Sequence, residues 1–423
     1  MRRAVGVFLA FLFILSNCAF AQSGGLQGGS QSSIAQANPQ SGSIQSSPQG
    51  GAPRTSPQNS SIKSSGAQTA AQTGAPAGTQ IRAGFSIEQR AGYKILTVSN
   101  LWPGANATRT YVLYPRGSQP PTDIKADLFI QVPVQRVVLY STTYIPALEE
   151  IGELNAIVGV DNASYVYSPA LRERIQAGKV IETSKNWMPD IERLIALKPD
   201  VIFNYGLGNE WDTFPKMQEA GLPVVLLGDW NEQDPIARAQ WAVFIAAFFN
   251  KEEKALDRIN ALAKAYTTLK NLAAGPAVRP KVLVNGPFRG IWTVSGGQSF
   301  MARLIQDAGG DYLWADNRDT GGLNLSIEAV FERAMRADIW LNPVYGAHRI
   351  ADIRALDPRF AALPVLQKGQ VWTNELRMSP GGGNDYFESA VMNPNLVLAD
   401  LIAIFHPELL PDHKFIYYKK LNE

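Results

Sequence analysis

The strongest constraint on the fold is an alternation of short apolar segments with amphipathic helical segments, which occurs twice. The first run places helical "IPALEEIG", "DIERLIAL" and "FPKMQEAG" between apolar "RVVLY", "IVGV", "DVIFN" and "PVVLL". After residue 276 the pattern restarts, with apolar "KVLVN", "DIWLN" and "QVWTN" among further helical segments. Short, continuously apolar strands between helices are typical of a parallel sheet covered on both faces. The sequence therefore predicts an α/β protein with two Rossmann-like lobes, residues 135–249 and 276–423.

The segment between the two runs predicts one long helix over residues 250–275. Its apolar residues recur at three-to-four spacing, which marks one face of a helix. They are Leu256, Ile259, Leu262, Ala263, Tyr266 and Leu269. Twenty residues of helix span about 30 Å, so this helix is long enough to join one lobe to the other.

The N-terminus has the layout of a secretory signal peptide over residues 1–21. Two arginines precede an apolar run, and the small-x-small sequence "AFA" follows it, so we expect cleavage before Gln22. The alternative is lipidation of Cys18, because "LSNC" loosely resembles a bacterial lipobox. Cys18 is the only cysteine, so the exported chain can form no internal disulfide.

Two further segments precede the first lobe. Residues 22–82 consist mostly of Gln, Ser, Gly, Ala, Pro and Thr, a composition that predicts a disordered, low-complexity linker because little of it can be buried. Residues 83–134 contain "FSIEQ", "YKILTVSN" and "TRTYVLYPRG", which alternate apolar and polar residues between turn signals. They predict a small antiparallel β-meander.

Two glutamates occupy matching places in the two lobes. Glu192 in "PDIERLIALKPDVIFN" and Glu328 in "LSIEAVFERAMRADIWLN" each fall in the first turn of a helix, with Asp190 and Ser326 as the expected N-caps. A carboxylate in this position interacts favourably with the helix dipole. Local stability and a joint functional role are therefore both open explanations.

Aromatic and cationic residues gather in the loops that follow the predicted strands. Ligands of open α/β sheets bind outside the carboxyl ends of the strands, so these residues either pack locally or line a cleft between the lobes. The set comprises Tyr165, Tyr167, Trp187, Tyr205, Trp211, Trp230, Phe288, Arg289, Trp292, Arg377 and Tyr386. It suggests a large, partly apolar ligand with carboxylate or phosphate groups for the arginines. The segment "SPGGGNDYFES" predicts a loop at the rim of that cleft.

Catalysis and nucleic-acid binding find little support. The exported chain has no thiol and no Gly-x-Ser-x-Gly motif, and its three histidines, His348, His406 and His413, are scattered. His406 is expected at the end of a helix. A net charge of +2, from 39 basic and 37 acidic residues, gives no electrostatic reason to expect nucleic acid as a partner.

The chain resembles the periplasmic binding proteins of iron-siderophore, haem and cobalamin ABC importers, in which one rigid helix joins two lobes. The resemblance covers about residues 136–405 and is most specific in "VVLYSTTYIPALEEIGELNAIVGV" and "DIERLIALKPDVIF". It implies that Glu192 and Glu328 bind arginines on the two permease subunits. It also implies ligand contacts from the loop Ser141, Thr142 and Thr143 and from Tyr165, Trp187, Trp211, Trp230 and Trp292, to which the residue chemistry adds Arg289, Arg377 and Tyr386.

The resulting hypothesis is a monomeric, exported binding protein without catalytic residues, metal site or resident cofactor. It would capture a ferric siderophore, corrinoid or haem and deliver it to an ABC permease dimer with its ATPase subunits. It would reside in the periplasm and touch the membrane only through the permease or through a lipid on Cys18. The alternative hypothesis is a bare metal-ion binder or a bilobal metal-dependent enzyme.

Overall fold

The computed structural model describes residues 80–423. The predicted signal peptide, Cys18 and residues 22–79 of the predicted linker lie outside the described residues. Across residues 80–423, no helix combines the length and the apolar composition that a membrane crossing requires.

The first lobe contains a five-stranded parallel sheet with the order β11-β10-β5-β6-β7. All predicted strands are present, and the chain adds the short strand β7. The strands are β5 (Val137–Leu139), β6 (Ile157–Val160), β7 (Ile181–Glu182), β10 (Val201–Tyr205) and β11 (Val224–Leu227). The helices are α2 (Ile145–Ile151), α3 (Pro169–Gln176), α4 (Ile191–Leu197), α5 (Phe214–Glu219) and α6 (Pro235–Ala247). The strand order reverses beside β5, so the loop after β5 lies where such sheets bind ligands.

The second lobe repeats this architecture with the strand order β15-β12-β17-β18-β19. Its strands are β12 (Lys281–Val284), β15 (Asp311–Tyr312), β17 (Ile339–Leu341), β18 (Val371–Thr373) and the antiparallel β19 (Lys419–Lys420). Its helices are α8 (Phe300–Asp307), α9 (Ile327–Ala334), α10 (Ile350–Arg354), α11 (Pro364–Gln367) and α12 (Pro394–Phe405). A small antiparallel sheet of β13 (Pro287–Phe288), β14 (Ile291–Ser295) and β16 (Gly322–Ser326) was not predicted.

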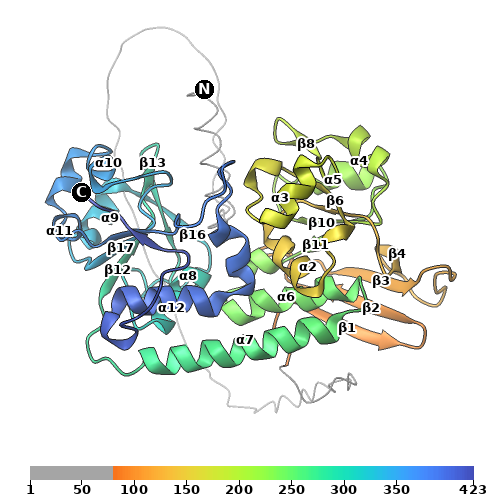
Figure 1. Ribbon diagram of the computed structural model, residues 1–423, viewed down its shortest axis with the longest axis horizontal. Helices are drawn as coiled ribbons and strands as arrows, with labels where there is room; N and C mark the ends of the chain where they lie inside the picture. Colours follow the sequence, from red (N-terminus) through yellow and green to blue (C-terminus); the bar gives the residue numbers. More distant parts are fainter. Residues whose placement is uncertain (1–79) are drawn as a thin grey trace, which may run out of the picture. The chain divides into compact units, whose positions relative to one another are not determined.

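A single long helix, α7 (Glu252–Ala273, 22 residues), joins the lobes (Figure 1). Ile259 and Leu262 belong to the hydrophobic core of the first lobe. Tyr266 and Ala273, further along the same helix, belong to the core of the second lobe. The predicted bridging helix is therefore confirmed, and its two ends are anchored in two different cores.

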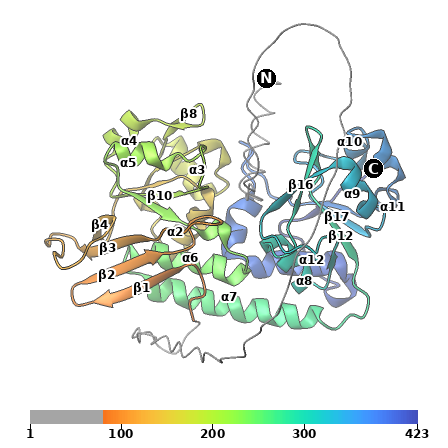
Figure 2. The ribbon, with the colours of Figure 1, turned by 180° about the vertical axis from the view of Figure 1, so that it is seen from behind.

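The N-terminal segment forms a four-stranded sheet with the order β1-β2-β3-β4 (Figure 2). The strands β1 (Phe85–Arg90), β2 (Tyr93–Val98) and β3 (Arg109–Pro115) pair antiparallel, as predicted. The fourth strand, β4 (Leu128–Val132), was not predicted and runs parallel to β3. Apolar residues of this sheet belong to the same buried cluster as the first lobe. The hydroxyl of Tyr111 also accepts a hydrogen bond from the Leu226 amide of edge strand β11 (2.9 Å).

Candidate functional site

Two adjoining pockets lie at the carboxyl ends of the strands of the two lobes. The first, about 1420 Å³ with its open mouth included, is lined by residues that follow β12, β17 and β18, among them Asn285, Asn342 and Asn374. The second, about 1030 Å³ on the same measure, is lined by residues that follow strands of the first lobe. Three residues line both pockets, namely Trp230, Arg238 and Phe387. The strand-end loops of both lobes thus contribute to one composite site.

The second pocket is built around the loop that follows β5. Ser141 and Thr142 lie in its wall, and the Ser141 hydroxyl accepts a hydrogen bond from the Thr143 amide (3.3 Å), which caps the short 3₁₀ helix that begins there. Asp161 follows β6 in the same wall, and burial raises the pKa of its carboxyl group to about 6. The pocket therefore offers hydroxyl groups and a carboxyl group with a raised proton affinity.

Arg238 supplies the positive charge that the two pockets share. Its Nε lies 4.0 Å from the carboxylate of Asp229, which is only 3% exposed, and burial raises the pKa of Asp229 while Arg238 opposes the rise. The guanidinium carbon lies 5.1 Å from the ring centroid of Phe300 in α8, so Arg238 connects the first lobe to the second. Its buried Nε has no hydrogen-bond partner among the described residues. This arrangement suits an anionic group on a ligand.

Sequence reasoning missed Arg238 because it lies in a helix and not in a loop after a strand. A signal was present, since the segment that forms α6 is otherwise almost wholly apolar and begins after Asp234, which caps the helix. A charged residue near the start of a helix that reads as buried is a candidate for a paired or ligand-facing charge.

Trp230 is the predicted aromatic residue with the most central position. It lies in the 3₁₀ turn Asp229–Asn231 that follows β11, and it lines both pockets. Its indole Nε1 is buried without a hydrogen-bond partner in the part of the chain that the structure describes. The indole offers a ligand both an apolar surface and one hydrogen-bond donor.

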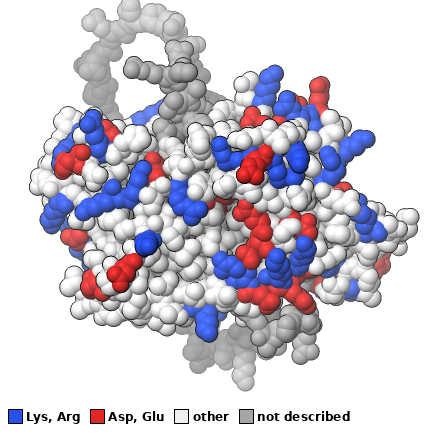
Figure 3. All heavy atoms as spheres, viewed as in Figure 1, with Lys and Arg blue, Asp and Glu red and all other residues white. Residues whose placement is uncertain are grey.

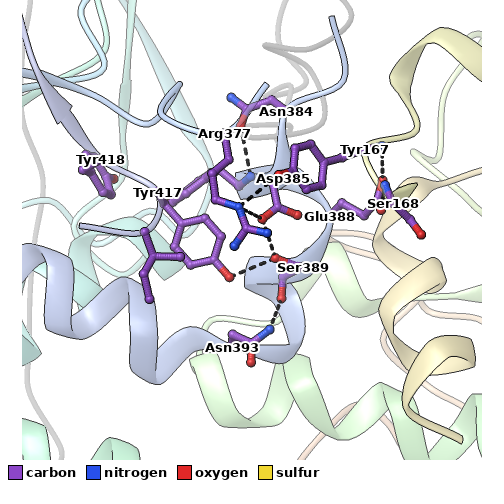
Figure 4. Close-up of polar contacts among 12 residues, drawn as sticks. Tyr167, Ser168, Arg377, Asn384, Asp385, Glu388, Ser389, Asn393, Tyr417 and Tyr418 are labelled. Carbon is purple, nitrogen blue, oxygen red and sulfur yellow. Dashed lines mark hydrogen bonds and ion pairs between the residues drawn. The ribbon is translucent and has the colours of Figure 1, made fainter. Parts of the chain in front are cut away.

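A segment of the second lobe, residues 377–393, reaches across to the first lobe and forms what we call the clasp (Figure 4). The carboxylate of Glu388 accepts hydrogen bonds from the backbone amides of Tyr167 and Ser168 just before α3, both at 2.8 Å. Arg377 donates to the Tyr167 hydroxyl (3.1 Å) and pairs with Asp385 (3.1 Å). These contacts hold the two lobes together at one side of the pockets.

Burial dominates the electrostatics of the clasp. Glu388 is 2% exposed, and desolvation raises the pKa of its carboxyl group to about 8, despite the two amide donors that favour the ionised form. The nearby carboxyl groups of Glu149 and Asp385 add to the rise. The predicted Arg377 thus has a structural partner in the clasp and lines neither pocket.

The glycine-rich part of the clasp borders the pockets. Gly382 and Asn384 line the second pocket, while Tyr386 and Phe387 line the first. A Cβ atom on Gly383 would lie 2.4 Å from the carbonyl oxygen of Tyr165. Glycine is therefore needed where this loop passes against the backbone of the first lobe.

The remaining predicted ligand contacts divide into two groups. Tyr165 lines the second pocket, and Trp187 packs against its ring at 5.9 Å. The other three residues line neither pocket, namely Trp211, Arg289 and Trp292. Trp211 is 62% exposed on a loop, and Arg289 lies over the ring of Phe288 at 5.1 Å.

Trp292 requires a correction. The sequence predicts Trp292 in a loop after β12, but the residue belongs to strand β14. Its side chain is 0% exposed and stacks on Trp340 at 5.3 Å. Trp292 is therefore part of the core of the second lobe and has no surface to offer a ligand.

The two predicted glutamates lie on exposed helix starts. Asp190 accepts a hydrogen bond from the Arg193 amide (3.1 Å) and Ser326 accepts one from the Ala329 amide (3.2 Å), so both predicted N-caps are confirmed. Glu192 and Glu328 are both exposed. Arg359 donates a hydrogen bond to Glu328 (2.8 Å) and thereby lowers the pKa of its carboxyl group.

The described residues offer little for a metal ion. No group of three or more His, Cys, Asp or Glu side chains with the arrangement of a metal site occurs within residues 80–423. Two histidines have other contacts: His406, at the end of α12, lies 3.1 Å from the Gly309 carbonyl oxygen, and His413 lies 2.6 Å from the Asp400 carboxylate. On the face that Figure 3 shows, acidic and basic side chains are interspersed.

The chain is similar in sequence to a lipoprotein and to a vitamin B12-binding protein. An uncharacterized lipoprotein of Methanocaldococcus jannaschii is 27% identical over 307 residues, which cover 69% of this chain and 70% of that protein. A vitamin B12-binding protein of Salmonella typhi is 28% identical over 259 residues, covering 61% of this chain and 85% of that protein.

Solved structures show the same fold. A periplasmic binding protein of Veillonella parvula superposes with a TM-score of 0.54 at 15% identity, covering 74% of this chain and 98% of that one. A periplasmic heme-binding protein of Pseudomonas aeruginosa gives a TM-score of 0.50 at 17% identity, covering 69% of this chain and 99% of that one. The model of the family described as "Periplasmic binding protein" matches residues 137–374, more than half of the chain. The chain therefore belongs to the periplasmic binding protein family.

Proposed function

We propose that this protein captures a metal chelate, of the ferric siderophore, haem or cobalamin type, between its two lobes and delivers it to an ABC permease. The family is one of binding proteins, and the chain is accordingly a binding protein and not an enzyme. The observation that carries the choice of ligand is the pair of adjoining pockets that share Trp230, Arg238 and Phe387. A ligand that occupies both pockets contacts loops of both lobes, which suits a bulky chelate.

The chemistry of the pocket walls supports the same ligand class. Apolar and aromatic side chains dominate the shared wall, and Arg238 provides a single positive charge paired with the buried Asp229. Such a site favours a ligand with a large apolar surface and an anionic group, as haem propionates or siderophore carboxylates provide. The vitamin B12-binding relative and the heme-binding fold relative have names that fall in this class.

Tryptophan fluorescence during titration with ferric siderophores, haemin and cyanocobalamin tests this proposal. We expect quenching by one ligand, loss of most of that response in Trp230→Phe, and an unchanged response in Trp211→Phe, because Trp211 lines neither pocket. Arg238→Gln is expected to weaken an anionic ligand roughly tenfold to hundredfold. Absence of binding to every ligand, checked by equilibrium dialysis as well, would refute the ligand class.

Delivery would use the two glutamates on the exposed helix starts. Glu192 and Glu328 lie on different lobes, and each carboxylate can accept a bidentate pair of hydrogen bonds from an arginine of a two-subunit permease. The protein would act after export. It would either be released into the periplasm after cleavage of the signal peptide or be anchored to the membrane by a lipid on Cys18. Labelling with a radioactive fatty acid, compared between the wild type and Cys18→Ala, separates these two routes.

A further inference from the structure

The N-terminal sheet contacts the first lobe through the loop between β2 and β3, here called the 99–105 loop. The ring of Trp102 stacks on Phe214 at 6.3 Å. A Cβ atom on Gly206, which follows β10, would lie 2.7 Å from that ring, and one on Gly228, which follows β11, would lie 1.8 Å from the carbonyl oxygen of Asn100. Glycine at both strand ends therefore lets the loop lie directly on the edge of the sheet where the pockets are built.

The same sheet also holds the turn that carries Trp230. The Asn231 side chain donates a hydrogen bond to Asn100 Oδ1 (2.5 Å). Glu232, which is 9% exposed, accepts hydrogen bonds from the Gly84 amide (2.7 Å) and from Trp241 Nε1 (2.9 Å). The two residues that follow Trp230 are thus held by contacts with the N-terminal segment, and Gly228, two residues before Trp230, lies against Asn100.

The 99–105 loop reaches the first pocket itself. Pro103 is exposed to solvent and lines this pocket together with Trp230 and Arg238. Because proline has a fixed φ and no amide hydrogen, it presents a rigid apolar surface. The family model begins at residue 137, so these contacts come from a part of the chain that precedes the matched region.

We propose that the N-terminal sheet is part of the ligand-binding site, where Asn100 positions the Trp230 turn and Pro103 forms an apolar wall of the first pocket that limits the size of the ligand. This inference rests on the proposed function for the identity of the ligand, but the positioning of the turn can be measured without one. The sheet would then help to determine specificity, in addition to extending the core of the first lobe.

The first experiment needs no ligand. Hydrogen–deuterium exchange of residues 228–233 is compared between the wild type and Asn100→Ala. We expect exchange in this segment to rise at least several-fold in the variant, with unchanged exchange in the matched turn after β18, because only the former contacts Asn100. Equal exchange in the two proteins would overturn the positioning role.

The second experiment measures ligand size selection. Pro103→Trp places a larger side chain at the first pocket, and Gln119→Trp, in the exposed loop between β3 and β4, is the matched control. We expect Pro103→Trp to weaken the largest bound ligand of the panel at least tenfold, and the control to bind like the wild type, with both variants melting within a few degrees of it. Equal affinities of both variants would overturn the wall role.

The two experiments separate the inference from the function on which it rests. If no chelate binds the wild type, the proposed ligand class fails, and the exchange result still decides whether Asn100 positions the turn. If a chelate binds the wild type and both variants equally, with no change in exchange, the proposed function stands and the role of the sheet fails.

Discussion

Helix α4 of the first lobe and helix α9 of the second begin in the same way but leave their glutamates in different electrostatic settings. Both helices have a side-chain N-cap and a glutamate in the first turn. Glu328 accepts a hydrogen bond from Arg359, whereas the Glu192 side chain has no hydrogen bond or ion pair with any residue between 80 and 423. Helix capping explains why a glutamate stands at each position, but only in the first lobe is the carboxylate available without displacing another group.

The same capped helix start therefore does not give the two glutamates the same functional environment. If the two glutamates bind permease arginines as proposed, an arginine that approaches Glu328 must compete with Arg359, while one that approaches Glu192 must displace only water. Glu388 in the clasp differs from both. It also lies at the start of a short helix, but it is buried, and its carboxylate accepts hydrogen bonds from backbone amides of the first lobe.

The largest effect is expected from the buried glutamate. The pKa of Glu388 is raised from 4.5 to about 8, so the folded state binds this proton more tightly than the unfolded state does. Its contribution to stability is fully present below about pH 4.5 and is lost as the pH rises toward 8, at about 1.4 kcal/mol per unit of pKa difference. Glu388→Gln stays neutral, so the stability of the variant relative to the wild type should increase by several kcal/mol over this range.

Urea denaturation at pH 5 and at pH 8 measures this change for both proteins. A difference between them that stays constant with pH would show that Glu388 is ionised throughout. Glu388 would then be ionised like the exposed Glu192 and Glu328, and burial would not distinguish it from them.

The next effect concerns the exposed pair. Glu192→Arg with Glu328→Arg should lower uptake of the ligand at least tenfold, because like charges would face the arginines that the docking proposal assigns to the permease. Ligand affinity should stay within about twofold of the wild type, since neither residue lines a pocket. Uptake by cells and binding in solution are measured side by side, and loss of binding with normal uptake per bound ligand would contradict the docking role.

Single replacements show whether the two lobes contribute equally. Glu192→Ala should reduce uptake several-fold, and more than Glu328→Ala does, because Arg359 already occupies part of the Glu328 carboxylate. Equal reductions would mean that Arg359 moves aside at no measurable cost.

The N-caps separate the structural role of each helix start from its docking role. Asp190→Ala and Ser326→Ala should each lower the free energy of unfolding by about 1 kcal/mol, as each removes an acceptor for one amide of the first turn. Thermal denaturation measures both variants, with Asp190→Asn and Ser326→Thr as controls that keep a capping group. A much larger decrease in the free energy of unfolding for one variant would show that the two N-caps do not contribute equally to stability.

The smallest effect is expected from Arg359→Ala. The residue lies on the surface, where solvent screens its ion pairs and they add little to stability. Removing it frees Glu328, so uptake should rise up to about threefold while stability changes little. Lower uptake in this variant would indicate that Arg359 itself contacts the permease.

Most of the fold was predictable because its signals are local. The apolar strands β5, β6, β10, β11, β12, β17 and β18, helix α7 and the two N-caps follow from apolar periodicity and from capping residues within a few positions. Among the strands that were missed, β7, β13 and β15 have two residues each, β14 pairs with β16 across a gap in the sequence, and β4 does so with β3. A short strand is defined by its partner more than by its own residues.

The site was predictable only in outline. The rule that ligand-contacting residues follow strands selected Tyr165 and Trp230, which line the pockets. The same rule selected Trp292, which lies in a core, and overlooked Arg238. Whether a side chain after a strand faces a pocket or a core depends on how the next segment packs, and that information is not local.

The sequence by itself determined the two α/β lobes, the joining helix and the capped glutamates, because each depends on residues close together in the chain. Only the tertiary structure decided which side chains meet. Glu388 binds the amide of Tyr167 across 221 positions of sequence, and Asn231 binds Asn100 across 131. Such contacts join residues that are far apart in the chain and depend on how two surfaces pack together. The apolar periodicity of either segment therefore does not predict them.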